Sequence, residues 1–271
     1  MNIKSFNHST RSGLLAWLAQ TRSTVALCAM SGAMLAAAGL LALTTSARAG
    51  DSDCPDSAVF PPYSHPYGAS YGEWLARFWK FTYAFPSTAD PDLGTADWSA
   101  NQHGEVWFLP VTFVSGSVTL TGTIPAETAL FGPVFSYEMD NSDCPTYNDY
   151  TLDQLEGILQ GFWSAVTETS CTIDGVAVKG MDNSQATPYL VWTPPFSYTL
   201  ASHDNLDAYF GYTCIPDGTT VYPAVACGVC VMIAPLPVGH HTIQFYVDDA
   251  GTVWTVTYEI TVVRRCDHGD K

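Results

Sequence analysis

Two charged side chains one helical turn apart are the first candidates for chemistry in this chain. Glu73 and Arg77 have i,i+4 spacing within residues 70–85, SYGEWLARFWKFTYAF, a segment rich in aromatic side chains. If they line a cleft, a partly desolvated carboxylate beside a guanidinium could act as an acid–base pair or hold a polar ligand, with Trp74 as one wall. On an open helix surface the same two residues form an ion pair worth only about 0.3 kcal/mol.

Other titratable residues could assist such a pair. His103 and Glu105 are two residues apart at the start of a predicted strand, so in an extended chain their side chains point the same way. This spacing suits either an ordinary turn or a metal or acid–base pair. His241 shares its predicted strand face with apolar residues, which is typical of a hydrogen-bonded core histidine, and a ligand-binding role is the alternative.

Several common catalytic and cofactor motifs do not occur in the sequence. There is no H-E-x-x-H, G-x-G-x-x-G or P-loop. Their absence argues against the common zinc proteases and nucleotide-binding enzymes. We therefore expect no cofactor and no metal ion.

Seven cysteines follow residue 49, and the odd number leaves one thiol free or joined to another molecule. They are Cys54, Cys144, Cys171, Cys214, Cys227, Cys230 and Cys266. We predict a bridge from Cys144 to Cys171, on either side of a helix, and one from Cys214 to Cys227 or Cys230. The C-x-x-C spacing of the last two precedes a strand pattern, which argues against a thioredoxin-like site. The remaining thiol could support self-association.

Two helices are predicted from their capping signals. Ser70 and Glu73 have the S-x-x-E spacing of a capping box, and a proline at position 86 ends the pattern, so a helix should cover residues 71–85. A T-x-x-Q spacing precedes an apolar stripe in residues 151–167, the second predicted helix.

Most of the remaining chain has strand patterns and turn signals. Asp174-Gly175 is a strong hairpin signal. The predicted strands are residues 106–109, 111–114, 117–124, 196–200, 229–234, 241–247 and 252–263. Together they predict a mainly β protein, an antiparallel sandwich or jelly-roll-like fold with two helices packed on or beside the sheets. Residues 86–97 contain three aspartates without the spacing of an EF-hand, and we expect a solvated loop there.

The first 49 residues differ from the rest in charge and hydropathy. They hold four of the ten basic residues and none of the 26 acidic ones, so the remainder has a net charge of 6 − 26 = −20. The apolar run 25–43 precedes Ala47-Arg48-Ala49, which predicts a signal peptide over residues 1–49, with an uncleaved anchor as the alternative. An extended arm, residues 50–69, and a single β-rich domain, residues 70–271, should follow.

This charge and this leader define where the protein should act. A strongly acidic surface repels nucleic acid and anionic lipid, so we expect no nucleic acid partner. We also expect no membrane attachment after cleavage, and a secreted protein of the periplasm or extracellular space.

Four blocks of the sequence carry a resemblance. YGEWLARFWKF, GEVWFLPVTF, TIPAETALFGPV and APLPVGHHTIQF are similar to a family of secreted bacterial proteins of unknown function with a YGEW, VWFL, PAxxALFxP and GxHTIxF pattern. The resemblance implies secretion and assigns no activity. Phe78 stands where the family has tryptophan, and Glu127-Thr128 where it has Gly-Lys, so any role of that lysine would be missing.

Three functions therefore stay open. The first is a binding protein for a glycan or other neutral ligand, with aromatic side chains such as Trp74 in its site. The second is a hydrolase or lyase that uses Glu73 with Arg77 and a nearby histidine or glutamate. The third is a structural or self-assembling extracellular protein.

Overall fold

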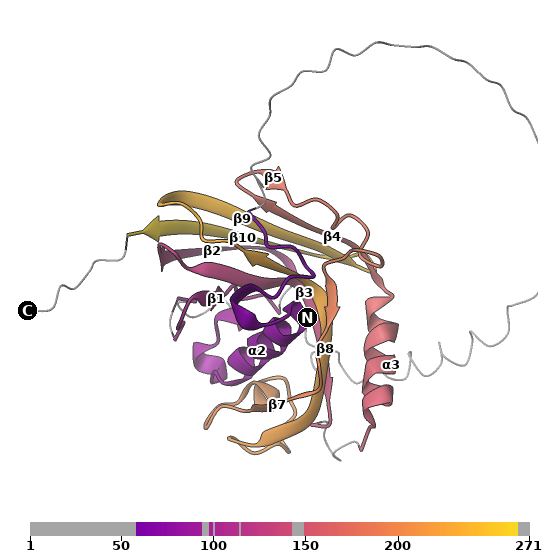
Figure 1. The fold of residues 1–271 in the computed structure, drawn as a ribbon. Helices are drawn as coiled ribbons and strands as arrows, with labels where there is room; N and C mark the ends of the chain where they lie inside the picture. Colours follow the sequence, from indigo (N-terminus) through magenta and orange to yellow (C-terminus); the bar gives the residue numbers. More distant parts are fainter. Residues whose placement is uncertain (1–57, 94–97, 100, 114, 143–148, 265–271) are drawn as a thin grey trace, which may run out of the picture. The chain divides into compact units, whose positions relative to one another are not determined.

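Two five-stranded β-sheets pack against each other in the computed structural model of this chain (Figure 1). The structure describes residues 58–93, 98–99, 101–113, 115–142 and 149–264. The predicted signal peptide, residues 50–57 of the predicted arm and three of the cysteines, Cys54, Cys144 and Cys266, lie outside these ranges. The predicted mainly β class is confirmed.

The first sheet, sheet A, is built around two long buried strands. Its order is β1 (Val106–Phe108), β3 (Ala129–Asp140), β8 (Thr220–Ile233) and β6 (Leu190–Trp192), and β7 (Phe196–Thr199) also pairs with β8. Every residue of β3 is buried, and so is the second part of β8. Strands with continuous burial are typical of a sheet covered on both faces.

The second sheet, sheet B, has one covered and one open face. Its order is β2 (Gly116–Pro125), β10 (Thr252–Val263), β9 (Gly239–Asp249), β4 (Val166–Ile173) and β5 (Val176–Ala177). Burial alternates along β9 and β10, as expected when one face packs on a core and the other meets solvent.

The sheets are mixed, because each contains one parallel pair beside the predicted antiparallel pairs. β1 runs parallel to β3, and β2 runs parallel to β10 over its whole length. The predicted strand over residues 111–114 is wrong where the structure describes it. Residues 111–113 form no strand, and the Val111 N–H donates to the Asp92 carboxylate instead.

Helix α2 (Tyr71–Tyr83) covers the face of sheet A that points away from sheet B (Figure 1). The predicted capping box of Ser70 and Glu73 is present. The rings of Tyr71 and Trp74 pack against Phe131 of β3. The helix ends two residues before the predicted end, where the Ala84 N–H bonds to carbonyls of the last turn.

Helix α3 (Leu152–Trp163) lies on the opposite face of sheet A (Figure 1), where Phe162 and Trp163 contact Tyr137. The predicted helix continued to residue 167, but Val166 already begins β4. A short helix, α4, is additional to the two that were predicted. The remaining helical turns are α4 (Leu206–Tyr209), η2 (Pro66–Gly68), η3 (Ser87–Ala89) and η4 (Pro91–Leu93).

The described end of the predicted arm is packed on the domain. Val59 pairs with Ile233 of β8, and the Phe60 N–H donates to the carbonyl of Met232. The indole of Trp74 donates to the carbonyl of Pro66 at 2.9 Å. Residues 58–69 therefore connect β8 with α2. Within the described ranges, no helix combines the length and apolarity that membrane crossing requires.

The predicted disulfide pairings are wrong. Cys171, Cys227 and Cys230 are free, buried thiols on β4 and β8. Burial raises the pKa of the Cys171 thiol to about 12 and raises those of the other two as well. Cys214 is disulfide-bonded, and its partner is none of these three. The pairings could not be predicted from cysteine spacing, because the spacing does not show that the thiols on β4 and β8 are buried in the core.

Asp90 and Asp92 are buried, which contradicts the predicted solvated loop. Their side chains lie after α2, at 0% and 3% exposure. Asp92 accepts hydrogen bonds from the Thr82 hydroxyl at 3.1 Å and from the Val111 N–H at 2.8 Å. Asp90 accepts the Asp92 N–H on Oδ1, while its buried Oδ2 has no partner among the described residues.

This pair holds a proton near neutral pH. Burial raises the pKa of Asp90 to about 7, and burial together with the Asp90 charge raises the pKa of Asp92. Both Asp92 oxygens accept hydrogen bonds, as an ionised carboxylate does. The geometry therefore favours Asp90 Oδ2 as the site of the proton.

Candidate functional site

Glu73, Arg77 and Trp74 form a surface brace on α2. Glu73 Oε2 accepts the N–H of Ser70 at 2.7 Å and its hydroxyl at 2.8 Å, so the carboxylate caps its own helix. The backbone and side-chain hydrogen bonds of Ser70 lower the pKa of Glu73, which is fully exposed. The Arg77 guanidinium lies over the Trp74 ring, 4.4 Å from its centre, in cation–π geometry.

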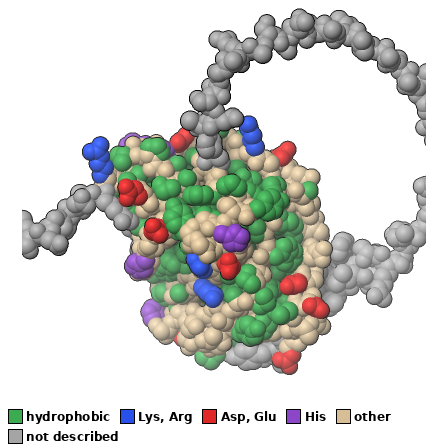
Figure 2. Space-filling view, viewed as in Figure 1, with side chains coloured by type: hydrophobic (Ala, Val, Ile, Leu, Met, Phe, Trp, Pro, Cys, Tyr) green, Lys and Arg blue, Asp and Glu red, His purple; other side chains and the backbone are tan. Residues whose placement is uncertain are grey.

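The surroundings of this brace are open. Figure 2 shows blue and red side chains gathered over α2 on a surface that is otherwise mostly apolar or neutral. The exposed carboxylate of Glu73 is used by the helix cap and does not face an enclosed cleft. The three residues come together, but as a brace of the α2 surface.

His103 and Glu105 lie in an exposed turn just before β1, beside Gly104, whose φ is +80°. The backbone carbonyl of Glu105 accepts the Ala129 N–H. Among the described residues, no hydrogen bond or ion pair joins these two side chains to each other or to Glu73. The structure does not assemble them with the brace on α2.

His241 is a structural cation at the start of β9. Its Nδ1 lies 2.8 Å from Asp174 Oδ2, and its Nε2 lies 2.8 Å from the carbonyl oxygen of Pro237. A carboxylate and a carbonyl can only accept hydrogen bonds, so both ring nitrogens must carry protons. Burial acts to lower the pKa of His241, but these two hydrogen bonds raise it overall. The imidazolium joins the β4–β5 turn to the loop before β9 and has no nitrogen left for a ligand.

The open face of sheet B is lined by hydroxyl groups, and we call it the hydroxyl face. Its residues are those whose side chains alternate with the buried ones on four adjacent strands. They are Ser117, Thr119, Thr121 and Thr123 of β2, Thr255, Thr257, Glu259 and Thr261 of β10, His240, Thr242, Gln244 and Tyr246 of β9, and Ser170 and Thr172 of β4. Strand register arranges them in ranks across the sheet.

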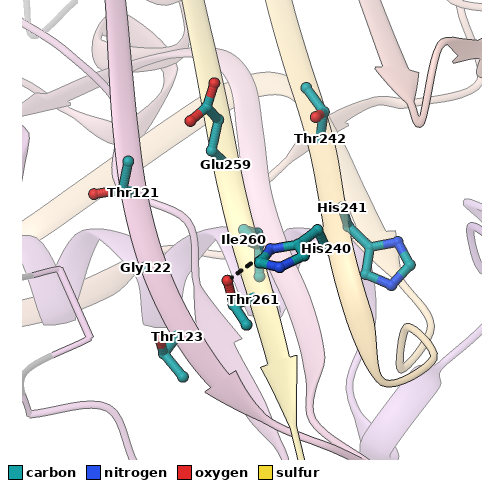
Figure 3. A pocket seen from close by; sticks show the side chains of 9 residues that line it. All are labelled: Thr121, Gly122, Thr123, His240, His241, Thr242, Glu259, Ile260 and Thr261. Atoms are coloured by element: carbon teal, nitrogen blue, oxygen red, sulfur yellow. Dashed lines mark hydrogen bonds between the residues drawn. The ribbon is translucent and has the colours of Figure 1, made fainter.

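A groove of about 470 Å³ crosses one end of the hydroxyl face (Figure 3). One rank in it consists of Thr121, Glu259 and Thr242, and the next of Thr123, Thr261 and His240. Figure 3 shows the rings of His240 and His241 on opposite sides of β9, with His240 reaching toward Thr261. The His240 Nδ1 lies 3.1 Å from the Thr261 hydroxyl oxygen, so that this ring is oriented by the sheet.

Glu259 supplies the one carboxylate among the described residues that line the groove. It lies in the middle strand with a threonine hydroxyl on either side, Thr121 and Thr242. No described residue forms an ion pair or hydrogen bond with Glu259, or with the side chains of these two threonines. The groove therefore offers a carboxylate acceptor, hydroxyls that can donate or accept, and an imidazole within two ranks.

The sequence contained part of the signal for this groove. The strict alternation of residues 252–263 places Glu259 on the solvent-exposed face of its strand. His240 and His241 are consecutive residues of a predicted strand, so their side chains must point to opposite faces. The contribution of β2 could not be found in this way, because β2 and β10 lie far apart in the chain and pair in parallel. Among the described residues, the groove is thus formed by β9 and β10, which are neighbours in the sequence, and by β2, whose position beside β10 the sequence does not reveal.

The fold and site define a mainly β, two-sheet protein with a polar groove on an open sheet face. No family model and no curated protein matches the chain. Among solved structures, PbICP-C in complex with falcipain-2 aligns with 59% of this chain and 100% of its own, at 10% identity and a TM-score of 0.22. The cysteine protease inhibitor EhICP2 from Entamoeba histolytica aligns with 55% of this chain and 88% of its own, at 10% identity and a TM-score of 0.18. At such TM-scores these likenesses carry no argument about fold or function.

Proposed function

We propose that this chain is a secreted binding protein that holds a neutral glycan on the hydroxyl face of sheet B. The observation that carries the proposal is the Glu259 carboxylate, which has no partner among the described residues and is flanked in register by Thr121 and Thr242. A carboxylate accepts two hydrogen bonds at once, and adjacent sugar hydroxyls donate in that pattern. The threonines supply the reciprocal donors and acceptors.

The charge of the protein selects the ligand. The chain has a formal net charge of −16, and the groove adds a carboxylate that no described residue pairs with. Both the net charge and this carboxylate would repel an anionic ligand, whereas a neutral polyhydroxylated ligand is not repelled by either. This supports a glycan without uronic acid, sulfate or phosphate groups.

Binding agrees better with the groove than hydrolysis does. Most glycoside hydrolases need two carboxyl groups that flank the scissile bond. Among the described residues that line the groove, Glu259 is the one carboxylate. The ring of His240 is hydrogen-bonded to the Thr261 hydroxyl. It is an imidazole and does not replace the second carboxyl group that such a hydrolase needs.

Glu259→Gln tests the proposal against the brace on α2. The amide keeps the shape of the side chain but exchanges one acceptor for a donor, so affinity for a neutral glycan should fall at least about tenfold, or about 1.4 kcal/mol. The matched control is Glu73→Gln, an exposed glutamate outside the groove, which should leave affinity unchanged. The protein, freed of its leader, would be screened on an array of neutral and acidic glycans and the best binder measured by titration calorimetry.

Two results would contradict the proposal. One is an array on which no neutral glycan binds. The other is binding that survives Glu259→Gln and is lost in Glu73→Gln with unchanged melting curves, because this would move the site to α2.

A further inference from the structure

The hydroxyl face continues well beyond the groove. We propose that it binds a linear, uncharged polysaccharide with β-1,4 linkages, which lies lengthwise along β10 and its neighbours β2 and β9. This inference rests on the proposed function and adds the length and shape of the ligand. The groove covers only the two ranks nearest His240, and two further ranks follow toward Tyr246.

The register of the strands fixes these further ranks. Thr119, Thr257 and Gln244 form the third rank, and Ser117, Thr255 and Tyr246 form the fourth. Successive ranks are two residues apart on each strand, about 6.7 Å, so the four ranks extend over about 20 Å. A surface of this length accommodates several sugar rings in a row, whereas a single ring would occupy the groove alone.

The third and fourth ranks can donate and accept hydrogen bonds without any charge. The hydroxyls of Thr119 and Thr255 have no hydrogen bond to another described residue, and neither has that of Ser117. Gln244 donates to the Thr257 hydroxyl at 3.3 Å, which leaves its amide oxygen open. Uncharged donors and acceptors in regular rows suit the repeating hydroxyls of a neutral polymer.

Tyr246 supplies an aromatic surface at the far end. It is half-buried, with Thr255 of β10 on one side and Ser170 of β4 on the other. An aromatic side chain with a polar tip can stack on the apolar face of a sugar ring and still bond its hydroxyls. The groove and Tyr246 therefore mark the two ends of one extended site.

The linkage follows from the shape of the surface. Rows that run along extended strands remain in contact only with a chain that is itself extended. A β-1,4-linked chain is a flat, extended ribbon, whereas an α-1,4-linked glucan coils and would leave the sheet after a few rings. The hydroxyl face thus fits the first kind of polymer.

The test compares ligands of different length on two proteins. Hexasaccharides of glucose, mannose and xylose in β-1,4 linkage, the matching disaccharides, and maltohexaose would be titrated by calorimetry. In the wild type the best β-1,4 hexasaccharide should bind at least about tenfold more tightly than its disaccharide. In the double variant Thr119→Val, Thr257→Val, which replaces each hydroxyl by a methyl group of similar shape, the hexasaccharide should lose that gain. The disaccharide should bind the variant and the wild type equally.

The outcomes separate this inference from the proposed function. Equal affinity for disaccharide and hexasaccharide, or an unchanged hexasaccharide affinity in the double variant, overturns the extended site while binding in the groove stands. Tighter binding of maltohexaose than of any β-1,4 hexasaccharide overturns the linkage. An array without any neutral binder overturns the proposed function itself, and the extended site with it.

Discussion

Replacing Gly72 with alanine should destabilise the protein by about 3 kcal/mol, the upper part of the usual range for overpacking. Gly72 lies in the first turn of α2, where the helix rests on the backbone of β6. A Cβ atom at this position would lie 2.3 Å from the carbonyl oxygen of Trp192 and 3.2 Å from its carbonyl carbon. Both are main-chain atoms of a paired strand, so the clash cannot be relieved by turning a side chain.

The matched control is the same substitution in α3. Gly157 is exposed on that helix, and an added Cβ would meet nothing within 4 Å. Alanine is the better helix former, so Gly157→Ala should stabilise the protein by about 0.5–1 kcal/mol. Urea unfolding followed by tryptophan fluorescence would measure both variants. A Gly72→Ala midpoint at or above that of the wild type would show that α2 does not rest on β6 in this way.

The elements predicted correctly from sequence are those defined by local signals. The S-x-x-E spacing fixed the start of α2, and the Asp174-Gly175 pair fixed the hairpin of β4 and β5, where both residues have positive φ. The alternation over residues 252–263 matches β10 residue for residue. In each case the residues that decide the structure are neighbours in the chain.

The strands at the centre of sheet A were missed or shortened for a physical reason. β3 was not predicted as a strand, because it is buried on both faces and therefore has no alternation, and it contains Gly132 and Pro133. Gly132 is needed where a Cβ would lie 3.0 Å from the ring of Phe245 in sheet B. Only the last part of β8 was predicted, since residues 220–228 lack a strand period. Burial by α2 and by sheet B is a property of the fold, which a single sequence does not display.

The candidate site shows the same division. The sequence identified both possible uses of Glu73, a helix cap and a reactive carboxylate, and the geometry shows its oxygen occupied by the cap. The sequence leaves two roles open for His241, a hydrogen-bonded core residue or a ligand-binding residue, and the geometry shows it hydrogen-bonded to Asp174 and Pro237, which the sequence could not name. Glu259 was placed on a solvated face but received no role, because the groove around it requires β2 beside β10.

Stability should fall as the pH rises from about 4 to about 7, contrary to the behaviour of a protein with well-paired carboxylates. Burial raises the pKa of Asp90 from its ordinary value of 3.8 to about 7. The folded protein therefore binds this proton more tightly than the unfolded chain does. The stabilisation is complete below about pH 4 and is lost as the pH passes through about 7, at about 1.4 kcal/mol per pKa unit.

Other titratable groups also change the stability with pH, either in the same direction as Asp90 or only at lower pH. Burial raises the pKa of Asp249, and the bonds to Asp174 and Pro237 raise that of His241, so both also lose stabilisation as the pH increases. The bond from His241 lowers the pKa of Asp174 despite its burial, and this contribution is lost only when the pH falls below the usual range of a carboxyl group. The maximum of stability should therefore lie at mildly acidic pH.

Asp90→Asn isolates the contribution of the buried pair. The Asn carbonyl can still accept the Asp92 N–H, and its amide group takes the place of the protonated Oδ2 without carrying a charge at any pH. The variant should equal the wild type near pH 4 and exceed its free energy of unfolding by at least about 1 kcal/mol near pH 8. Asp182→Asn, an exposed aspartate in a loop, is the control and should follow the wild-type curve. Urea unfolding at a series of pH values would decide the matter, because wild-type and Asp90→Asn curves that run parallel from pH 5 to pH 8 would show that Asp90 is already ionised in the folded protein.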